Sequence, residues 1–293
     1  MGITPAVCDK IGKEEYLEVA AKFDASADSN HRNGEAAGNN KSRKNRRRQR
    51  KVPVMASPVQ GLFETCRKVF ANSRTGFVPP PEDICLLRSV LDNLRPEDLG
   101  LSANMPYFRR MMVDRPQTIS YIHLHECDKF SIGIFCLPPS GVIPLHNHPG
   151  MTVFGKLLFG TMHIKSYDWV VGDIGSSSAI STQVHPSGAR LAEVKVDSEF
   201  TAPCNTSVLY PADGGNMHRF TGVTACAILD VLGPPYSDPD GRHCTYYRDH
   251  PLTNLSGSEE EGGAGYAWLE EIEKPEDFSV VGTLYGGPAL TRR

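Results

Sequence analysis

The stretch GVIPLHNHPGMTVFGKLLFG, residues 141–160, places two histidines one residue apart between glycine and proline residues. Alternate side chains of a β-strand point to the same face, about 7 Å apart along the chain. His146 and His148 would then face one side of a strand, close enough to bind a single metal ion. The stretch therefore predicts a β-strand that carries two metal ligands.

The rest of the chain also favours β structure. Its 293 residues include 27 Gly and 22 Pro, which indicate many turns rather than long helices. After Thr118 come eight short runs rich in β-branched and aromatic residues: TISYIHLHE, FSIGIFCLP, MTVFGKLLFG, TMHIKSYDWV, ARLAEVKVD, TSVLYP, MHRFTG and ACAILDVLG. Strands at such short spacing predict a sandwich or closed barrel over about residues 118–233.

Two helices are expected before the barrel, within residues 57–101. SPVQGLFETCRKVFANS and PPEDICLLRSVLDNL each repeat apolar residues at helical spacing. The two stripes are Val59, Leu62, Phe63, Cys66, Val69 and Phe70, then Ile84, Leu87, Val90, Leu91 and Leu94. Residues 234–293 look rich in loops, with one helical turn around AWLEEIE.

The N-terminal residues 1–55 differ from the rest in composition. Residues 1–52 hold 12 Lys/Arg against 7 Asp/Glu, although the whole chain has a formal net charge of -3. A polar segment without apolar periodicity cannot bury enough surface to fold, so we expect a disordered basic tail ahead of one domain at 56–293. The tail ends in KSRKNRRRQRK, where 8 of 11 residues are basic.

That basic run predicts a nuclear-import signal or, alternatively, a solvated linker without a partner. The signal would comprise Arg43, Lys44, Arg46, Arg47, Arg48, Arg50 and Lys51. No apolar stretch is long enough to cross a bilayer, and the N-terminus lacks the apolar core of a secretory signal. The eight dispersed cysteines suit free thiols in a reducing compartment. We therefore expect a soluble protein of the nucleus and cytoplasm, without a membrane partner.

A third metal ligand is expected at His218, in PADGGNMHRF. It follows a glycine-rich turn at the start of a run that could return beside the first two histidines. His123 and His125, in YIHLHE, have the same spacing as the first pair and are the rival metal ligands. Their run lacks the flanking glycine and proline and has no distant histidine in a matching context.

The arrangement of an H-x-H pair and a distant histidine resembles the two metal motifs of the cupin barrel, over about Ser120 to Leu232. The resemblance implies a double-stranded β-helix, or jelly-roll barrel. The usual cupin motif has a glutamate three or four residues after the second histidine, where this chain has Thr152 and Val153. A three-histidine iron site without a carboxylate resembles the thiol dioxygenase branch of the cupins.

The phrases PLHNHPGMTVFGKLLFGTMHIKSYDWV, PADGGNMHRFT, AILDVLGPPY and GRHCTYY resemble plant cysteine oxidases, relatives of animal cysteamine dioxygenase. The resemblance implies a monomer in which Fe(II) and O2 oxidise the N-terminal cysteine of target proteins to the sulfinic acid. Expected targets are transcription factors of the hypoxia response, because oxidation feeds the arginine branch of N-degron proteolysis. Three neutral imidazoles leave Fe(II) its full double charge, which favours an incoming thiolate.

The same resemblance implies roles for Asp230, Tyr236, Cys244 and Tyr246, and the expected strand after the first two histidines adds His163 as a further candidate. Asp230 would hold the substrate amine or a water, or make a structural hydrogen bond, since a buried carboxylate needs a partner. Tyr236 would place a phenol near the sulfur or pack a loop. Cys244 and Tyr246 are similar to the pair that can cross-link in the animal relative. His163 would donate a hydrogen bond to the site, or lie satisfied in the core.

Two other functions stay open from the sequence. One is a dioxygenase of small thiols such as cysteamine or free cysteine. Free cysteine would need a buried cation for its carboxylate, and Arg219, next to His218, should point to the opposite face of its strand. The other is a non-catalytic cupin that holds a structural metal while its basic tail binds nucleic acid, a partner that we do not expect.

Overall fold

The computed structural model describes residues 57–109, 116–170, 188–251 and 265–291. The basic tail and its import signal lie outside these residues. The described helices are α2 (Pro58–Val69), α3 (Pro81–Asp92) and the short 3-10 helices η1 (Pro96–Leu99), η2 (Pro106–Phe108) and η3 (Asp238–Asp240). Among them, none is long and apolar enough to span a membrane.

Strands make up most of the described chain. They are β1 (Ile119–Glu126), β2 (Ser131–Leu137), β3 (Val142–Asn147), β4 (Thr152–Phe159), β5 (Thr161–Trp169), β6 (Arg190–Thr201), β7 (Ser207–Leu209), β8 (Met217–Gly222), β9 (Cys226–Gly233), β10 (Tyr246–Pro251), β11 (Tyr266–Ile272) and β12 (Val280–Thr283).

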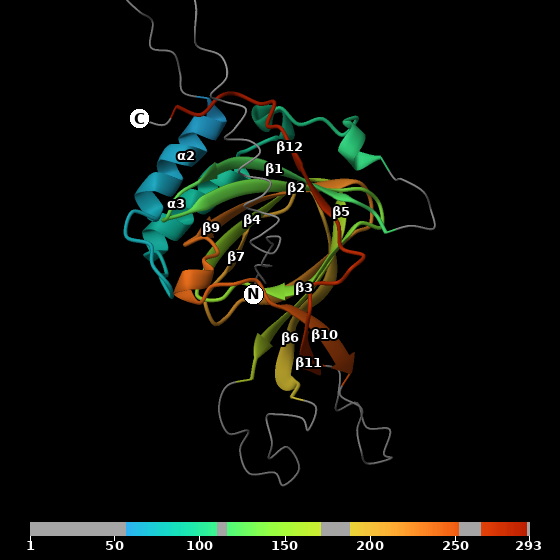
Figure 1. Cartoon of the computed structure of the whole chain (residues 1–293). Helices are drawn as coiled ribbons and strands as arrows, with labels where there is room; N and C mark the ends of the chain where they lie inside the picture. The colour runs from blue at the N-terminus through green and yellow to red at the C-terminus, as the bar shows by residue number, and fades with distance from the viewer. Residues whose placement is uncertain (1–56, 110–115, 171–187, 252–264, 292–293) are drawn as a thin grey trace, which may run out of the picture.

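The strands form two sheets (Figure 1). The first sheet has the order β12-β1-β2-β9-β4-β7. The second has the order β10-β11-β6-β5-β8-β3 and closes through the pairing of β10 with β3. The prediction of a mainly β jelly-roll barrel with N-terminal helices is confirmed.

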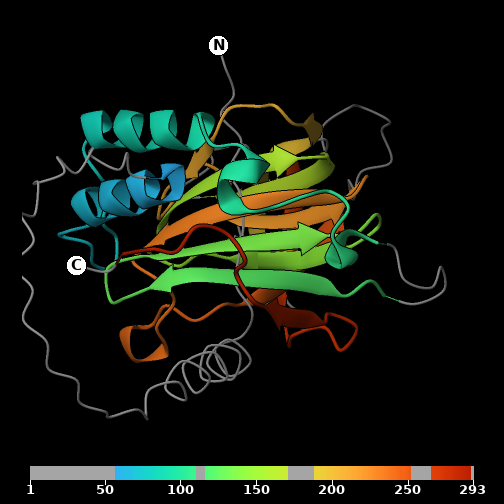
Figure 2. The ribbon, with the colours of Figure 1, turned by 90° about the horizontal axis from the view of Figure 1, so that it is seen from above.

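Helices α2 and α3 lie against the outer face of the first sheet (Figure 2). The side chain of Ser57 caps the start of α2, and Pro58 occupies the first helical position, where its missing N–H costs nothing. The buried residues of α2 are Val59, Leu62, Phe63, Cys66 and Val69, which are members of the predicted stripe. They pack with alternate residues of the first sheet, among them Phe154 and Val231.

The opposite face of the first sheet encloses the barrel interior together with the second sheet. Phe135 and Ile228 from the first sheet and Ile164 and Phe220 from the second belong to one buried cluster. Each side chain lies two positions from the next inward one on its strand, as the period of a β-strand requires. The barrel interior is therefore mainly apolar, and any polar side chain that points into it is surrounded by apolar residues.

The prediction for the C-terminal part is wrong in two respects. AWLEEIE is not a helical turn but belongs to β11, which pairs with β10 and β6. Ala267 and Leu269 are buried at alternate positions, as in a strand. This alternation covers too few residues to be recognised in the sequence beside the helix-forming glutamates. The barrel also extends beyond residue 233, because β10, β11 and β12 complete the two sheets.

A buried charge joins α3 to the first sheet. The Lys156 ammonium on β4 lies 3.2 Å from an Asp92 carboxylate oxygen and also donates to the Cys204 carbonyl. The same Asp92 oxygen accepts hydrogen bonds of 2.6 Å from the N–H and the hydroxyl of Thr206. Partial burial disfavours ionised Asp92, but the bonds from Thr206 and Lys156 outweigh it and lower the pKa.

We predict that Asp92→Asn lowers the free energy of unfolding by about 2 kcal/mol, because it leaves the Lys156 ammonium buried without its counter-charge. The contribution of Asp92 is complete above about pH 5 and is lost as the pH falls through its lowered pKa. Urea unfolding at pH 7 and at pH 3 measures both effects. The control is Glu64→Gln, which breaks an exposed ion pair with Arg67 and should cost less than about 0.5 kcal/mol. Equal losses from the two variants at pH 7 would contradict the prediction.

Candidate metal centre

Two of the predicted ligands face each other on adjacent strands of the second sheet. His146 of β3 pairs directly with His218 of β8. The row extends to the neighbouring strand on each side, since Tyr246 of β10 pairs with His146 and Ser166 of β5 pairs with His218. Paired residues of an antiparallel sheet point to the same face, so the row faces the barrel interior. His148 lies one residue beyond the end of β3.

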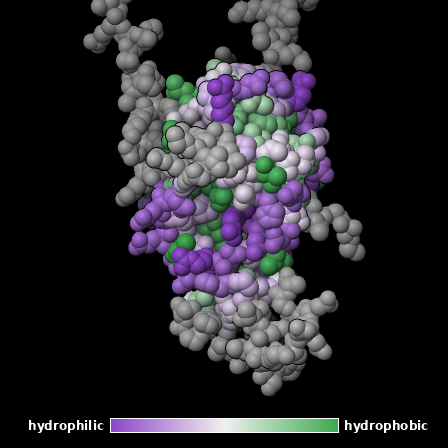
Figure 3. Space-filling model, turned by 90° about the vertical axis from the view of Figure 1, so that its right-hand side faces the viewer, coloured by the Kyte–Doolittle hydropathy of each residue, from purple (hydrophilic) through white to green (hydrophobic). Residues whose placement is uncertain are grey.

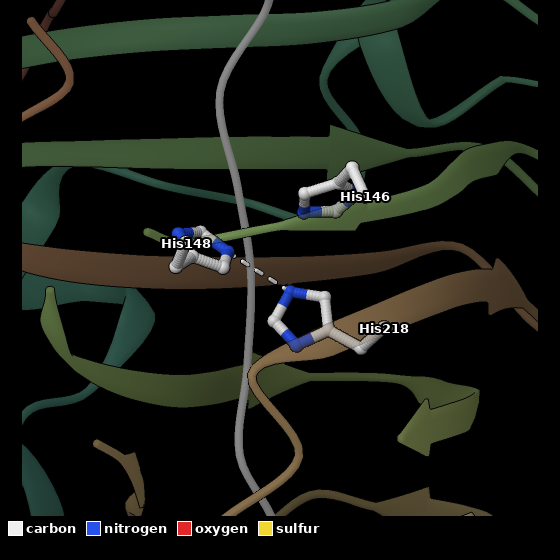
Figure 4. A group of neighbouring side chains, drawn as sticks. All are labelled: His146, His148 and His218. Carbon is white, nitrogen blue, oxygen red and sulfur yellow. Dashed lines mark hydrogen bonds between the residues drawn. The ribbon is translucent and has the colours of Figure 1, made fainter. Parts of the chain in front are cut away.

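The three imidazole rings converge on one point (Figure 4). All three residues are fully buried, and their nearest ligand nitrogens lie within 4.8 Å of one another. The Nε2 atoms of His148 and His218 are 3.1 Å apart. Two nitrogens bound at about 2.1 Å to one ion at a right angle would lie about 3 Å apart. The donor set therefore fits a single transition-metal ion.

The second nitrogen of two of the rings is held by the protein. His146 Nδ1 lies 2.6 Å from the Pro144 carbonyl. The Tyr236 hydroxyl donates to the Asn147 carbonyl at 2.6 Å, so its oxygen accepts the Nδ1–H of His148 at 3.1 Å. Contacts of this kind fix the tautomer that leaves Nε2 free to bind a metal.

Burial also keeps the site in its metal-binding form. It lowers the pKa of His218 well below the ordinary value, and nearby His146 lowers it further. An imidazole must be neutral to donate an electron pair to a metal. At neutral pH His218 thus offers a metal ion an uncharged nitrogen donor.

The Asn216 side chain joins the two segments that carry the ligands. Its Oδ1 accepts from the His148 N–H at 3.1 Å, and its Nδ2 donates to the carbonyls of His148 and Tyr210, each at 2.9 Å. The last backbone pair of β3 and β8 is Asn147 with Met217, so the Asn216 amide continues the ladder by one rung. This contact fixes the backbone of His148 after its strand has ended.

Asp168 fixes the turn in front of His218. Its carboxylate accepts from the backbone N–H groups of Gly215 and Asn216, at 2.9–3.1 Å. Asp168 lies at the end of β5 and is 5% exposed. Its two backbone contacts hold the turn that carries Asn216.

A buried arginine fixes the loop that carries Tyr236. Arg242 donates to the Pro235 carbonyl at 2.9 Å, to the hydroxyl of Thr75 and to the carboxylate of Asp240. The guanidinium is thus held within the loop and by the segment that follows α2. Because Pro235 precedes Tyr236, Arg242 also places the phenol that contacts His148.

The other candidate residues differ in how they are placed relative to the three histidines. Tyr236 contacts the His148 ring, and Tyr246 flanks His146 in the interior row. Cys244 is partly buried and packs against the same interior clusters. Asp230 is fully buried on β9 of the first sheet, where its neighbours on β2 and β4 are Gly133 and Gly155. The roles implied for these residues stay predictions.

The two expectations for His163 are wrong. On β5, Met162 and Ile164 point inward, so the intervening imidazole points outward. The side chain of His163 is 37% exposed, and its Nε2 lies 3.0 Å from the Asp197 carboxylate. His163 therefore neither supports the site nor lies in the core.

The rival ligands are not part of the cluster found among the described residues. His123 and His125 lie on β1 of the first sheet, and the ring of His125 packs between Phe63 and Phe130 at 4.8 and 5.0 Å. The expectation for Arg219 is confirmed. It points away from the interior and lies 2.8 Å from Asp249.

Sequence reasoning missed four residues that support the site: Asn147, Asp168, Asn216 and Arg242. A signal existed for Asn216, because it lies two residues before His218 and after two glycines, a place where a polar side chain can replace backbone pairing. Asp168 and Arg242 act on residues that are far away in the sequence, so only the fold reveals their partners.

We predict that Tyr236→Phe weakens metal binding by about 10- to 100-fold, because His148 loses the acceptor that orients its ring. Competition against a chromogenic chelator measures the affinity. The matched control is Tyr247→Phe, since the Tyr247 hydroxyl contacts the side chain of Asn147 and none of the three rings. The same loss in both variants would exclude a specific role for Tyr236.

Comparison with known proteins places this site in a family. The family model PCO_ADO matches residues 90–290. The chain is 55% identical to plant cysteine oxidase 2 of Arabidopsis thaliana, over 88% of this chain and 92% of that protein. It is 58% identical to plant cysteine oxidase 1 of the same plant, over 79% of this chain and 80% of that protein.

A mouse 2-aminoethanethiol dioxygenase is 32% identical, over 80% of this chain and 97% of that protein. Among solved structures, an RmlC-like cupin protein from Desulfovibrio desulfuricans is 20% identical over 46% of this chain and 97% of its own, with a TM-score of 0.27. The family match and the relatives at 55–58% identity both span most of the chain. The chain therefore belongs to the PCO_ADO family of thiol dioxygenases.

Proposed function

We propose that the protein uses O2 to oxidise the N-terminal cysteine of other proteins to cysteine sulfinic acid. Both oxygen atoms of O2 are added to the sulfur, so a thiol becomes a sulfinic acid and no external reductant is consumed. The observation that carries the proposal is the cluster of three buried imidazoles without a carboxylate among the ligands. The names of the two plant relatives support cysteine as the substrate.

Fe(II) is the metal that we propose for this site. His146, His148 and His218 would hold it through their Nε2 atoms. When bound, Fe(II) supplies a redox-active centre with open positions for a thiolate and for O2. Imidazole suits iron, and an uncharged donor set leaves the full positive charge to attract the thiolate.

The protein itself would bind and orient the substrate. Burial lowers the pKa of His218, so this imidazole would accept no proton from the thiol, and the outer nitrogens of His146 and His148 are already engaged. Asp230, on the facing sheet, is a buried carboxylate that would hold the ammonium group of an N-terminal cysteine. Opposite charges near the two ends of the substrate would place its sulfur toward the histidines.

Oxidation of a small thiol is the second candidate function, because the animal relatives are named 2-aminoethanethiol dioxygenases. Free cysteine fits less well, since its carboxylate needs a cation. Arg219 points outward to Asp249, and Arg242 is engaged by three partners. An N-terminal cysteine of a polypeptide has no such carboxylate and needs no cation.

We predict that the iron-loaded protein adds two oxygen atoms to a short peptide that begins with Cys and none to its acetyl-Cys twin. The reason is that acetylation removes the ammonium group that Asp230 would hold. Mass spectrometry after aerobic incubation measures the products, and His218→Ala, which removes a ligand, should lose at least 100-fold in rate.

Cysteamine in parallel separates the two candidates. Oxidation of cysteamine without oxidation of the Cys peptide would favour the small-thiol function. No product from any substrate, with iron shown to be bound, would leave only a non-catalytic metal site.

The wider role that we propose is oxygen sensing. Sulfinic acid formation would mark transcription factors of the hypoxia response for the arginine branch of N-degron proteolysis, so these targets would persist when O2 is scarce. The enzyme would act as a monomer in the nucleus and the cytoplasm. The basic run at residues 41–51 would direct nuclear import.

We predict that deleting residues 41–51 from a fluorescently tagged chain lowers the nuclear fraction by at least half, because the import signal is lost. The tag must exceed the size limit for passive entry through nuclear pores. Replacing all eight basic residues of the run by glutamine is the control for chain length and should give the same loss. An unchanged distribution in both variants would show that the run is a linker.

A further inference from the structure

Ser166 is a buried polar residue beside the metal ligands. It lies on β5 and is fully buried, and among the described residues no hydrogen-bond partner lies in reach of its hydroxyl. A buried hydroxyl without a partner loses its hydrogen bonds to water and gains nothing in return. Such a group calls for a physical explanation.

The position of Ser166 points its hydroxyl toward the site. Met162 and Ile164 belong to the interior cluster, so the next inward position of β5 is Ser166. Ser166 pairs directly with His218, and side chains in such a pair lie about 5 Å apart on one face. The interior row therefore reads Tyr246, His146, His218 and Ser166, in that order.

A β-bulge lies at the same place. The register between β5 and β6 shifts between Ser166 and Tyr167. Bulges re-aim side chains and occur often beside active sites. The outer face of this sheet is not short of polar partners, since Tyr167, on the other side of β5, donates to Asp249 at 2.7 Å. Figure 3 shows a largely hydrophilic surface on the side where β5 lies in Figure 1. The hydroxyl of Ser166 thus points into the barrel, although polar hydrogen-bond partners are present on the outer face of β5.

We infer that Ser166 is a specificity-determining residue, whose hydroxyl hydrogen-bonds the first peptide unit of the substrate. The inference rests on the proposed function. In a Cys-initiated peptide the first peptide unit lies about 4 Å from the sulfur, within reach of a side chain adjacent to a metal ligand. A hydroxyl both donates and accepts, which matches the C=O and N–H of a peptide unit. Cysteamine has no such unit, so this contact favours polypeptides.

A substitution cycle tests the contact. Two peptides of identical sequence begin with Cys, and one has its first peptide bond replaced by an ester, which removes the N–H and weakens the carbonyl as an acceptor. For the wild-type protein we expect kcat/KM to fall about 10-fold from the amide to the ester. For Ser166→Ala we expect the amide to be about 10-fold slower than in the wild type, and the ratio of amide to ester to approach one. An unchanged ratio in the variant would overturn the inference.

Thermal unfolding provides a second readout. Because Ser166→Ala removes an unpartnered hydroxyl, Tm should stay the same or rise by about 2–4 °C while kcat/KM falls. The matched control is Ser207→Ala, since the buried Ser207 hydroxyl donates to the Gly155 carbonyl at 3.2 Å and its loss should lower Tm. Equal falls in Tm would show that Ser166 has a structural partner and would overturn the inference.

The two failures are distinguishable. If the wild-type protein, with iron bound, does not oxidise the amide peptide, the proposed function fails. If it oxidises both peptides and Ser166→Ala does so at wild-type rates, the proposed function holds and the role of Ser166 fails.

Discussion

The site depends on the antiparallel pairing of β3 with β8. This pairing brings His146 opposite His218, residues that are 72 positions apart in the sequence. The register is critical, because a slip of one residue on either strand would turn that histidine to the opposite face of the sheet. Two features fix it. Ile143 and Phe220 pair within the apolar interior, and the Asn216 amide binds the backbone of His148 beyond the end of β3.

Contacts around the imidazole rings orient them, which the pairing of β3 with β8 alone does not do. The Pro144 carbonyl holds one nitrogen of the His146 ring, and the Tyr236 hydroxyl holds one nitrogen of the His148 ring. The irregularity between Ile143 and His146 lets the Pro144 carbonyl reach the ring of His146. Arg242 in turn holds the loop of Tyr236. The convergence of three nitrogens is thus supported by contacts from several separate segments of the chain.

The sequence predicted the parts of the fold that depend on local pattern. The two helices and eight of the strands follow from apolar periodicity, and the three ligands from histidines beside glycine and proline. The prediction failed where the local sequence pattern favours one structure but contacts with distant strands impose another. AWLEEIE has helix-forming residues, yet the edges of β10 and β6 pair with it as β11. His163 looked like a residue of the site because it is near it in sequence, but strand alternation turns it to Asp197. The partners of Asp168 and Arg242 could not be predicted, since they depend on loops that meet only in the folded chain.

The carboxylate of Asp230 and the three histidines lie on different sheets, and this separation bears on the choice of substrate. Asp230, a buried carboxylate, lies on the first sheet and is not a member of the three-histidine cluster on the second. Its neighbours across both adjacent strands are glycines, Gly133 and Gly155, and the ring of Tyr121 fills the space that a side chain at Gly133 would take. A carboxylate among the ligands would cancel part of the metal charge and weaken the attraction for a thiolate. Kept on the opposite sheet, the same negative charge would attract an ammonium group instead. On the proposed function, the head of an N-terminal cysteine, with a thiolate at one end and an ammonium at the other, matches this separation of charge between the sheets.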